Sequence, residues 1–357
     1  MIDTIELMLD IDKIHRDELY DAINDAIEYS NETDTRKSKK LHTDKKKRYV
    51  HTAAFHDYGI LDLKLYSSMN YGLKNNWIVI RYKPAMRIYR DKYALAKEHD
   101  LIEASNIFEK FIGYLNGFVM DGFELPIDIN VWKVRRIDYA FQFKTNYFRE
   151  YLTLFKNGYK KLNDDVYDTS FYVKGKNTNV NFYDKTVQVL NKENRLHQLD
   201  FYTEHIVRLE VQCKRKYLDY IIYKNTVMQP IVKELWNMKV AAKSILSKLK
   251  SYIGVSDYWC LEKGLEILNN SFTEKKVAKI EKILHLTLHN RMLLKRVPEK
   301  IEEESKGLIK AKYVRDKLFP ALKKVNMNPV CIPKYWGIEW LQNPVKLIPE
   351  LKEYIKP

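Results

Sequence analysis

The sequence has few of the residues from which several common functional sites are built. It has three cysteines, Cys213, Cys260 and Cys331, which lie far apart and form no CxxC pair. This spacing supports neither a disulfide framework nor a cysteine zinc site, and it fits a reducing cytoplasm. Glycine occurs only 11 times, and neither a Walker-type phosphate loop nor a GxGxxG loop is present. An ATPase or a dinucleotide-binding enzyme is therefore not expected.

Two further features are missing. The chain has no HExxH and no His-x-His, although His285 and His289 are spaced to share one face of a helix. A histidine metal site is therefore not predicted. No apolar run approaches the ~20 residues of a membrane span, and the N-terminus has no signal-peptide core. We expect no membrane partner.

The charge is strongly unbalanced. Lys and Arg number 62 against 47 Asp and Glu, which gives a net charge of +15 and a pI of about 9.3. This excess indicates a polyanionic partner, most often nucleic acid, with an anionic membrane surface as the competing interpretation. Apolar residues make up 45% of the 357 residues, so the chain can bury a sizeable core and form more than one domain.

The hydrophobic pattern predicts an α+β protein. Up to about residue 222, alternating segments typical of strands occur between helical patterns, and beyond about Met228 the pattern is nearly all helical. We expect a mixed or antiparallel sheet domain with flanking helices over residues 1–225. A mainly helical domain over residues 226–330 and an irregular tail over residues 331–357 would follow.

Three predicted strands carry ionisable residues on one face. In the strand over residues 136–143, Asp138 alternates with apolar neighbours, and in the strand over 207–211, Arg208 and Glu210 do so. Along residues 180–185, Tyr183 and Lys185 occupy the same outward-facing positions. If the three strands are neighbours, these five side chains meet on one surface of the sheet.

Such a group suits attack on a phosphodiester. Lys185 and Arg208 can activate the phenol of Tyr183 and bind the phosphate. Asp138 and Glu210 offer the oxygen ligands that Mg²⁺ or Mn²⁺ prefers, and such an ion would neutralise developing charge. These residues predict metal-dependent DNA nicking with a covalent phosphotyrosyl product. The alternative is that the charged residues form surface ion pairs and that the tyrosine is an ordinary strand residue.

Two basic segments are candidates for DNA binding. The first holds eight Lys and Arg between Arg36 and Arg48 and ends in Lys45, Lys46, Lys47 and Arg48. This composition is typical of a solvated loop or of a flexible arm that binds phosphates. The second is a predicted helix over residues 310–324 that follows a short glycine-containing turn, as in a helix-turn-helix. Lys310, Lys312 and Arg315 lie at its start, although a basic helix packed on the body would look the same.

The order of these motifs resembles that of a known family. They are Met1-Ile2-Asp3, Ile80-Arg81-Tyr82-Lys83-Pro84-Ala85, Arg136-Ile137-Asp138, Phe182-Tyr183-Asp184-Lys185, Val207-Arg208-Leu209-Glu210 and Trp340-Leu341-Gln342-Asn343-Pro344-Val345. In this order the chain resembles the replication endonucleases of filamentous phages, of the gene II and gene X type, and related plasmid rolling-circle initiators. Each motif is short, and the resemblance is scattered over nearly the whole chain.

The resemblance implies a strand-specific nick at a replication origin, followed by rolling-circle synthesis and rejoining. The family's nucleophilic tyrosine would fall on Tyr183, with Lys185 beside it. Asp138 and Glu210 match the family's Arg-Ile-Asp and Arg-x-Glu positions, and their role as metal ligands is our inference. The chain departs from many nicking enzymes in having no His-x-His, the motif with which they hold their metal.

The expected partners are duplex and single-stranded origin DNA and a host helicase, in the cytoplasm of a bacterial host. A monomer and a dimer are both compatible with the sequence. Two other functions stay open: a non-catalytic origin- or RNA-binding protein, in which the basic segments act alone, and an interaction protein of a phage particle. A covalent adduct between Tyr183 and DNA would distinguish the enzyme from either.

The first basic segment yields a test. Replacing Lys45, Lys46, Lys47 and Arg48 by Ala should weaken binding to all DNA sequences alike and flatten its salt dependence. Each neutralised phosphate contributes roughly −0.9 to the slope of log K against log salt on duplex DNA. The slope can be measured by fluorescence anisotropy across a salt series. An unchanged slope would show that this segment does not touch DNA.

Overall fold

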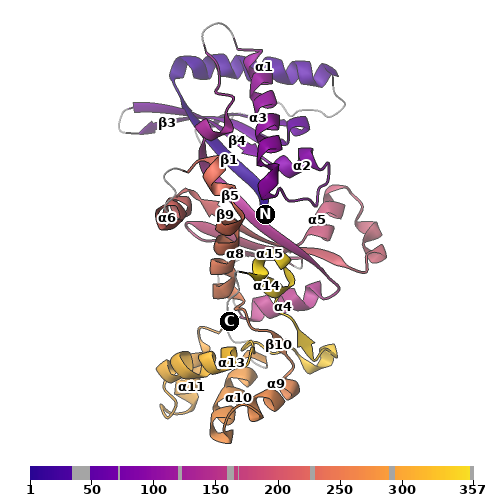
Figure 1. The fold of residues 1–357 in the computed structure, drawn as a ribbon, viewed down its shortest axis with the longest axis vertical. Coiled ribbons are helices and arrows are strands. Elements are labelled where there is room, and N and C mark those ends of the chain that lie inside the picture. Colours follow the sequence, from indigo (N-terminus) through magenta and orange to yellow (C-terminus); the bar gives the residue numbers. More distant parts are fainter. Residues whose placement is uncertain are drawn as a thin grey trace. The chain divides into compact units, whose positions relative to one another are not determined.

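The chain forms the α+β fold that its sequence predicts. An antiparallel sheet in the N-terminal half precedes a mostly helical C-terminal region (Figure 1). The structure, a computed structural model, describes residues 1–33, 49–70, 73–119, 123–158, 165–167, 169–225, 230–288 and 294–353.

Two compact units divide the chain, and they are interleaved in sequence. The first unit comprises Met1–Ala140, Lys176–Asn179 and Glu210–Ala241. The second comprises Phe141–Gly175, Val180–Leu209 and Ala242–Pro357. The three consecutive domains predicted from the sequence, residues 1–225, 226–330 and 331–357, describe a different division from these interleaved units.

The sheet has the strand order β2-β3-β4-β1-β5-β9-β8-β7-β6. Every pair with a described register is antiparallel, for example β1 with β4 and β1 with β5. The strands are β1 (Ile2–Ile11), β2 (Tyr49–Phe55), β3 (Ile60–Asn70), β4 (Leu73–Tyr82), β5 (Lys133–Thr145), β6 (Asp165–Tyr167), β7 (Ser170–Val173), β8 (Thr178–Asp184) and β9 (His205–Lys214). In this order β5, β9 and β8, the three strands with candidate site residues, are consecutive, which meets the condition stated from the sequence.

The helices agree with the predicted α+β pattern. They are α1 (Lys13–Thr33), α2 (Pro84–Ile88), α3 (Leu101–Asn116), α4 (Phe148–Gly158), α5 (Lys185–Lys192), α6 (Arg215–Asn225), α7 (Val232–Leu235), α8 (Met238–Tyr252), α9 (Leu261–Asn269), α10 (Glu274–Leu288), α11 (Val297–Glu304), α12 (Ala311–Tyr313), α13 (Phe319–Lys324), α14 (Pro344–Leu347) and α15 (Pro349–Lys352). A short strand pair, β10 (Tyr258–Trp259) and β11 (Trp340–Leu341), joins the helical region to the tail.

In the first unit, one face of the sheet packs against α3. The helix buries apolar residues at positions three and four apart, which gives it a continuous apolar stripe. Tyr82 of β4 lies on the sheet face that contacts α3: its ring packs on Phe108 at 5.9 Å, and its hydroxyl donates to the Ala104 carbonyl at 2.8 Å. Ile5 of β1 is paired with Tyr82 and with Ile137 of β5, so these residues share the apolar face.

Alternation along the strands places a polar row on the opposite face. Glu6 of β1 is paired with Arg81 of β4 and with Arg136 of β5, and Thr4 is paired with Asp138. Because successive residues of a strand point to opposite faces, these five residues face away from α3. The candidate carboxylate Asp138 thus belongs to a sheet face that carries several charges.

A β-bulge lies at the start of β1. Ile2 is paired with Tyr139 and Thr4 with Asp138, so Asp3 is an extra residue on β1. Ile2 and Ile5 are three positions apart and are paired with Tyr139 and Ile137, which share one face of β5, so the bulge places both on the same face. Bulges of this kind redirect side chains and recur beside functional sites.

In the second unit, several helices from α9 onward share one apolar core. The core residues come from α9, α10, α11 and α13, from the segments between α11 and α13, and from the segment that follows α13: Leu268, Val277, Ile280, Ile283, Leu284, Leu286, Val297, Ile301, Ile309, Val314, Leu318, Ala321, Leu322, Met327 and Cys331. The helix predicted over residues 310–324 is interrupted by one π-helical turn, Val314–Leu318, just before Pro320. Proline lacks the N–H that an α-helix needs there, and the wider turn accommodates this loss.

The C-terminal tail is anchored by buried polar contacts. Asn343 is fully buried, and its amide donates to the carbonyls of Ser256 at 3.0 Å and Ile253 at 3.2 Å. Its backbone N–H donates to Asp257, which also binds the amine of Lys346 at 2.9 Å. The tail, expected to be irregular, therefore contains β11, α14 and α15 and contributes to the structure of the second unit.

This anchor gives a stability test. Asn343→Ala should lower the free energy of unfolding by about 2–4 kcal/mol, because it leaves buried carbonyls without a donor and creates a void. The exposed Glu350→Ala in α15 is the control and should change stability by less than about 0.5 kcal/mol. Urea unfolding followed by tryptophan fluorescence measures both. Equal stabilities for the two variants would contradict the anchoring role.

Candidate active site

Three buried carboxyl groups occur in the polar part of the first unit. Asp3 lies on the bulge of β1, Asp138 on β5 and Glu210 on β9, and each of these residues is less than a tenth exposed. We call these three residues the carboxylate cluster. Asp138 and Glu210 were predicted from the sequence. Asp3 was not predicted, because it belongs to the cluster only through the β-bulge in β1.

Asp138 is held by a two-pronged contact with arginine. Arg136 donates from Nε to Oδ1 at 2.7 Å and from Nη2 to Oδ2 at 2.6 Å, and it approaches Glu6 at 3.7 Å. Asp138 is only 1% exposed. A paired guanidinium is the partner expected for a carboxylate removed from water.

The pKa of Asp138 is nevertheless raised, to about 8. Burial is the largest cause, the negative charge of Glu210 is the second, and Asp3 adds to the effect. The contact with Arg136 lowers the pKa but does not outweigh these causes. A buried carboxyl beside a second carboxylate keeps its proton near neutral pH, a pattern that is concentrated at functional sites.

The other two members of the cluster are fixed by neutral and cationic donors. Gln212 donates to Glu210 Oε1 at 2.8 Å and itself accepts from Asn179 at 3.0 Å. Asp3 accepts from Lys83 Nζ at 3.0 Å and from the Thr4 hydroxyl at 3.0 Å. Both carboxylates are therefore oriented before any ligand binds.

The carboxylate cluster meets some of the requirements of a site for a hard divalent cation. Within the described ranges, no three His, Cys, Asp or Glu side chains converge closely enough to enclose a metal ion. Mg²⁺ needs fewer protein ligands, since one or two carboxylates with water and phosphate oxygens commonly hold it. Asp138 and Glu210 supply such a pair, and their mutual repulsion would be relieved by a cation.

Tyr183 lies in the second unit and is buried. It occupies β8, where it is paired with Ser170 of β7, and its side chain is 5% exposed. The sequence predicted a polar, outward-facing position, and this prediction is wrong. β8 lies between β9 and β7, inside the sheet, and residues on both of its faces are buried.

The two cationic candidates of the second unit are also buried. Arg208 of β9 is completely inaccessible and donates from Nη2 and Nε to Gln142 Oε1 at 2.7 and 3.2 Å. Lys185 was predicted on a strand but is the first residue of α5, where its amine donates to Gln188 at 2.7 Å. Helix α5 begins there because Asp184 caps it, accepting from the Val187 N–H at 3.0 Å.

An aspartate–histidine pair next to Tyr183 was missed from the sequence. The second carboxylate oxygen of Asp184 contacts Nδ1 of His205, and the His205 ring is stacked near Phe148 at 6.4 Å. The two residues are 21 positions apart, and no spacing motif joins them. The only available signal was that an aspartate directly before a helical pattern is a typical N-cap.

The candidate residues thus fall into two groups on three adjacent strands. Asp138 and Glu210 belong to the first unit, and Tyr183, Lys185 and Arg208 belong to the second. β9 contributes to both groups, since Arg208 and Glu210 are two residues apart and share a face of that strand. The condition that β5, β9 and β8 be neighbours is met, and a joint action of the two groups stays a prediction.

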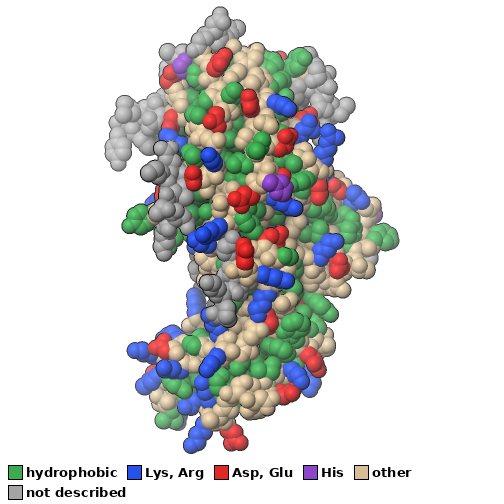
Figure 2. Space-filling view, viewed as in Figure 1, with side chains coloured by type: hydrophobic (Ala, Val, Ile, Leu, Met, Phe, Trp, Pro, Cys, Tyr) green, Lys and Arg blue, Asp and Glu red, His purple; other side chains and the backbone are tan. Residues whose placement is uncertain are grey.

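Two of the predicted base-reading residues have acidic partners. Lys310 lies 3.3 Å from Glu302, and Arg315 contacts Glu299, both on α11, whereas Lys312 is exposed. Figure 2 shows Lys and Arg side chains scattered over the helical region, with acidic side chains between them. Lys45, Lys46, Lys47 and Arg48 lie outside the described residues.

Comparison with known proteins adds no family. Neither the scan of protein-family models nor the search of curated proteins found a match for this chain. None of the helices in the described part of the chain has the length and apolar character of a membrane span. The resemblance to phage and plasmid replication endonucleases therefore stays a proposal.

The raised pKa of Asp138 predicts a pH-dependent effect on stability. The folded chain keeps this proton up to about pH 8, while an unfolded aspartate releases it near pH 4, so the contribution of Asp138 to stability falls as pH rises between these values. Asp138→Asn removes this titration. The melting temperature of the variant minus that of the wild type should therefore be larger at pH 8.5 than at pH 5.

Differential scanning fluorimetry at the two pH values checks this expectation. The control is Asp10→Asn, at an exposed position of β1 where the carboxylate binds Lys133 at 2.7 Å. Its melting difference from the wild type should be similar at both pH values. A pH-independent difference for Asp138→Asn would show that the carboxylate cluster does not hold a proton.

Proposed function

We propose that the chain is a rolling-circle replication initiator that nicks one strand at a replication origin. In this proposal Tyr183 is the nucleophile, and Asp138 and Glu210 are the acidic residues of the active site. The observation that carries it is the buried pair of carboxyl groups, with a raised pKa at Asp138, on the neighbouring strands β5 and β9, of which β9 adjoins β8, the strand of Tyr183. The net charge of +15 suits a DNA substrate.

The reaction would exchange one phosphoester for another. The Tyr183 oxygen attacks the phosphorus, the bond to the 3′ oxygen breaks, and the 3′ oxygen takes up the proton that the phenol gives up. The products are a 5′-phosphotyrosyl link and a free 3′-hydroxyl. Because the new link keeps the energy of a phosphodiester, attack by the 3′-hydroxyl can rejoin the strand.

Four other side chains have supporting roles in this proposal. Arg208 and Lys185 would bind the phosphate and stabilise the charge that develops on it. Asp138 and Glu210 would hold Mg²⁺ or Mn²⁺, which supplies charge neutralisation at the scissile phosphate. For Asp138, this role requires that the contact with Arg136 loosens, since that arginine engages both carboxylate oxygens.

The burial of Tyr183 adds a condition. A side chain that is 5% exposed cannot reach a phosphodiester until its surroundings move. The same burial favours the second candidate, a non-catalytic protein that binds origin DNA or RNA through exposed basic residues. In that case Tyr183 and Arg208 would only stabilise the folded structure.

Tyr183→Phe distinguishes the two functions. The rate of nicking of a supercoiled origin plasmid with Mg²⁺ or Mn²⁺ should fall by roughly a thousandfold or more, because the substitution removes the attacking oxygen and leaves the ring in place. DNA binding should change little. The control is Tyr220→Phe on α6, whose side chain is 49% exposed, and it should nick normally.

The assay scores nicked circles and protein–DNA adducts on denaturing gels. Normal nicking by Tyr183→Phe would refute the assignment of the nucleophile. Absence of nicking and of adducts with the wild-type protein, together with tight binding, would favour the non-catalytic alternative.

A further inference from the structure

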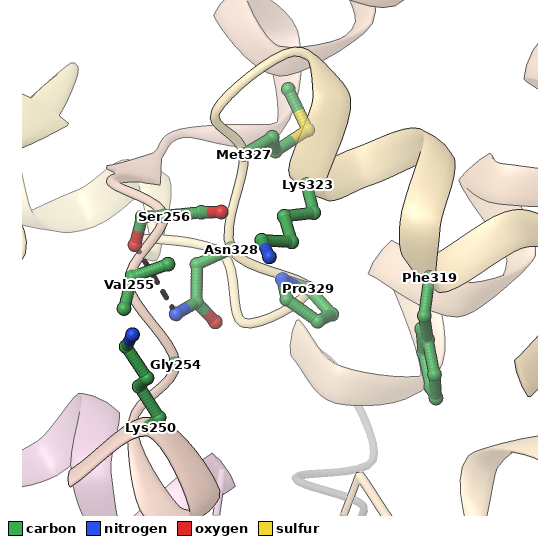
Figure 3. A pocket seen from close by; sticks show the side chains of 9 residues that line it. All are labelled: Lys250, Gly254, Val255, Ser256, Phe319, Lys323, Met327, Asn328 and Pro329. Atoms are coloured by element: carbon green, nitrogen blue, oxygen red, sulfur yellow. Dashed lines mark hydrogen bonds between the residues drawn. The ribbon is translucent and has the colours of Figure 1, made fainter. Parts of the chain in front are cut away.

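A cavity in the second unit has the features of a ligand site. Its volume is about 240 Å³, and it lies between the end of α8, the loop after it and α13 (Figure 3). The residues that line it are Lys250, Gly254, Val255, Ser256, Phe319, Lys323, Met327, Asn328 and Pro329. None of the candidate active-site residues is among them.

The lining is positively charged. It contains two lysines and no acidic residue. Figure 3 shows the Lys323 amine directed toward Asn328 and Pro329, and the Lys250 amine toward Val255. In contrast to Lys310 and Arg315, neither lysine has an ion pair within the described residues. Two cations beside a hollow without a counter-charge favour binding of an anion.

One wall of the cavity is rigid. Asn328 donates from its amide to the carbonyls of Ile253 at 2.8 Å and Ser256 at 3.4 Å. Asn343 donates to the same two carbonyls, and Gly254 between them adopts a positive φ of 65°. The loop is therefore held in place without a ligand, as expected of a preformed site.

The size and the aromatic lining narrow the choice of ligand. A volume of 240 Å³ is below the ~300–1,000 Å³ typical of drug-sized ligands, so a dinucleotide would not fit. Phe319 adds an aromatic side chain to the lining, apart from the two lysine amines in Figure 3, and bases stack on such rings. We propose that the cavity binds one nucleotide, with its phosphate between Lys250 and Lys323 and its base against Phe319.

This ligand could be a free nucleotide or one unit of a nucleic acid strand, because the recognised chemistry is the same. A simpler explanation for the lysines is that each lies in the last turn of its helix, where a cation stabilises the helix dipole. Lys324 shares that position with Lys323 but does not line the cavity. It is therefore a matched control.

The experiment measures binding to the full-length chain without metal, by isothermal titration calorimetry. The probes are inorganic phosphate, thymidine 5′-monophosphate and a ten-nucleotide oligo(dT). Lys250→Gln and Lys323→Gln should each lower the affinity for the monophosphate about tenfold, which is the contribution of one charge-assisted hydrogen bond. Lys324→Gln should leave this affinity unchanged. Melting temperatures confirm that each variant is folded.

Phe319→Leu separates base recognition from phosphate binding. This substitution should lower the affinity for the monophosphate and leave the affinity for inorganic phosphate unchanged. Tighter binding of oligo(dT) than of the monophosphate, with the same dependence on Lys323, would assign the site to a strand, and the reverse order would assign it to a free nucleotide.

Two results would overturn the proposal. One is absence of binding by all three probes, and the other is an equal loss in Lys323→Gln and Lys324→Gln, which would indicate general surface charge. Because the measurement involves no strand cleavage, its outcome is independent of whether Tyr183 is a nucleophile.

Discussion

The candidate site depends on one electrostatic constraint, the burial of Asp138 next to Glu210. Two carboxylates removed from water and placed near each other cannot both ionise without compensation. Arg136 compensates for part of this charge, and Lys83 neutralises Asp3 on the bulge of β1. The remaining repulsion appears as a proton retained to about pH 8. A divalent cation would relieve the same repulsion, so the feature that limits stability is also the one that suits phosphoryl chemistry.

The sequence predicted which strands carry the candidate site but not how deeply they are buried. Alternation identified the shared faces of β5, β9 and β8, and the three strands are neighbours. Alternation assumes that the polar face meets water, however, and Tyr183, Arg208 and Glu210 are all buried on central strands. A strand covered on both faces cannot be recognised from the types of one or two polar residues.

The other failures concern local geometry and distant pairs. A bulge such as that at Asp3 has no reliable sequence signal, because it depends on the register with the neighbouring strand. Lys185 was assigned to a strand because the N-cap role of Asp184 went unrecognised. In the helical region, Glu299 lies 16 positions from Arg315, so their contact depends on how α11 packs and not on a local pattern. That contact weakens the case for Arg315 as a base-reading residue, since the cation already has a partner.

Tyr183 must become accessible if it is to act as the nucleophile that we propose, and its strand, β8, lies near one end of the sheet. On one side Tyr183 is bordered by β7 and then β6, which form the end of the sheet. β7 has four residues and β6 has three, and Tyr183 is paired with Ser170 at the start of β7. The described pairing of β7 with β8 covers four residue pairs, from Ser170–Tyr183 to Val173–Val180, so few hydrogen bonds hold this edge. The Tyr183 side chain projects from a face of the sheet, so its accessibility depends on what packs on that face as well as on the pairing along this short edge.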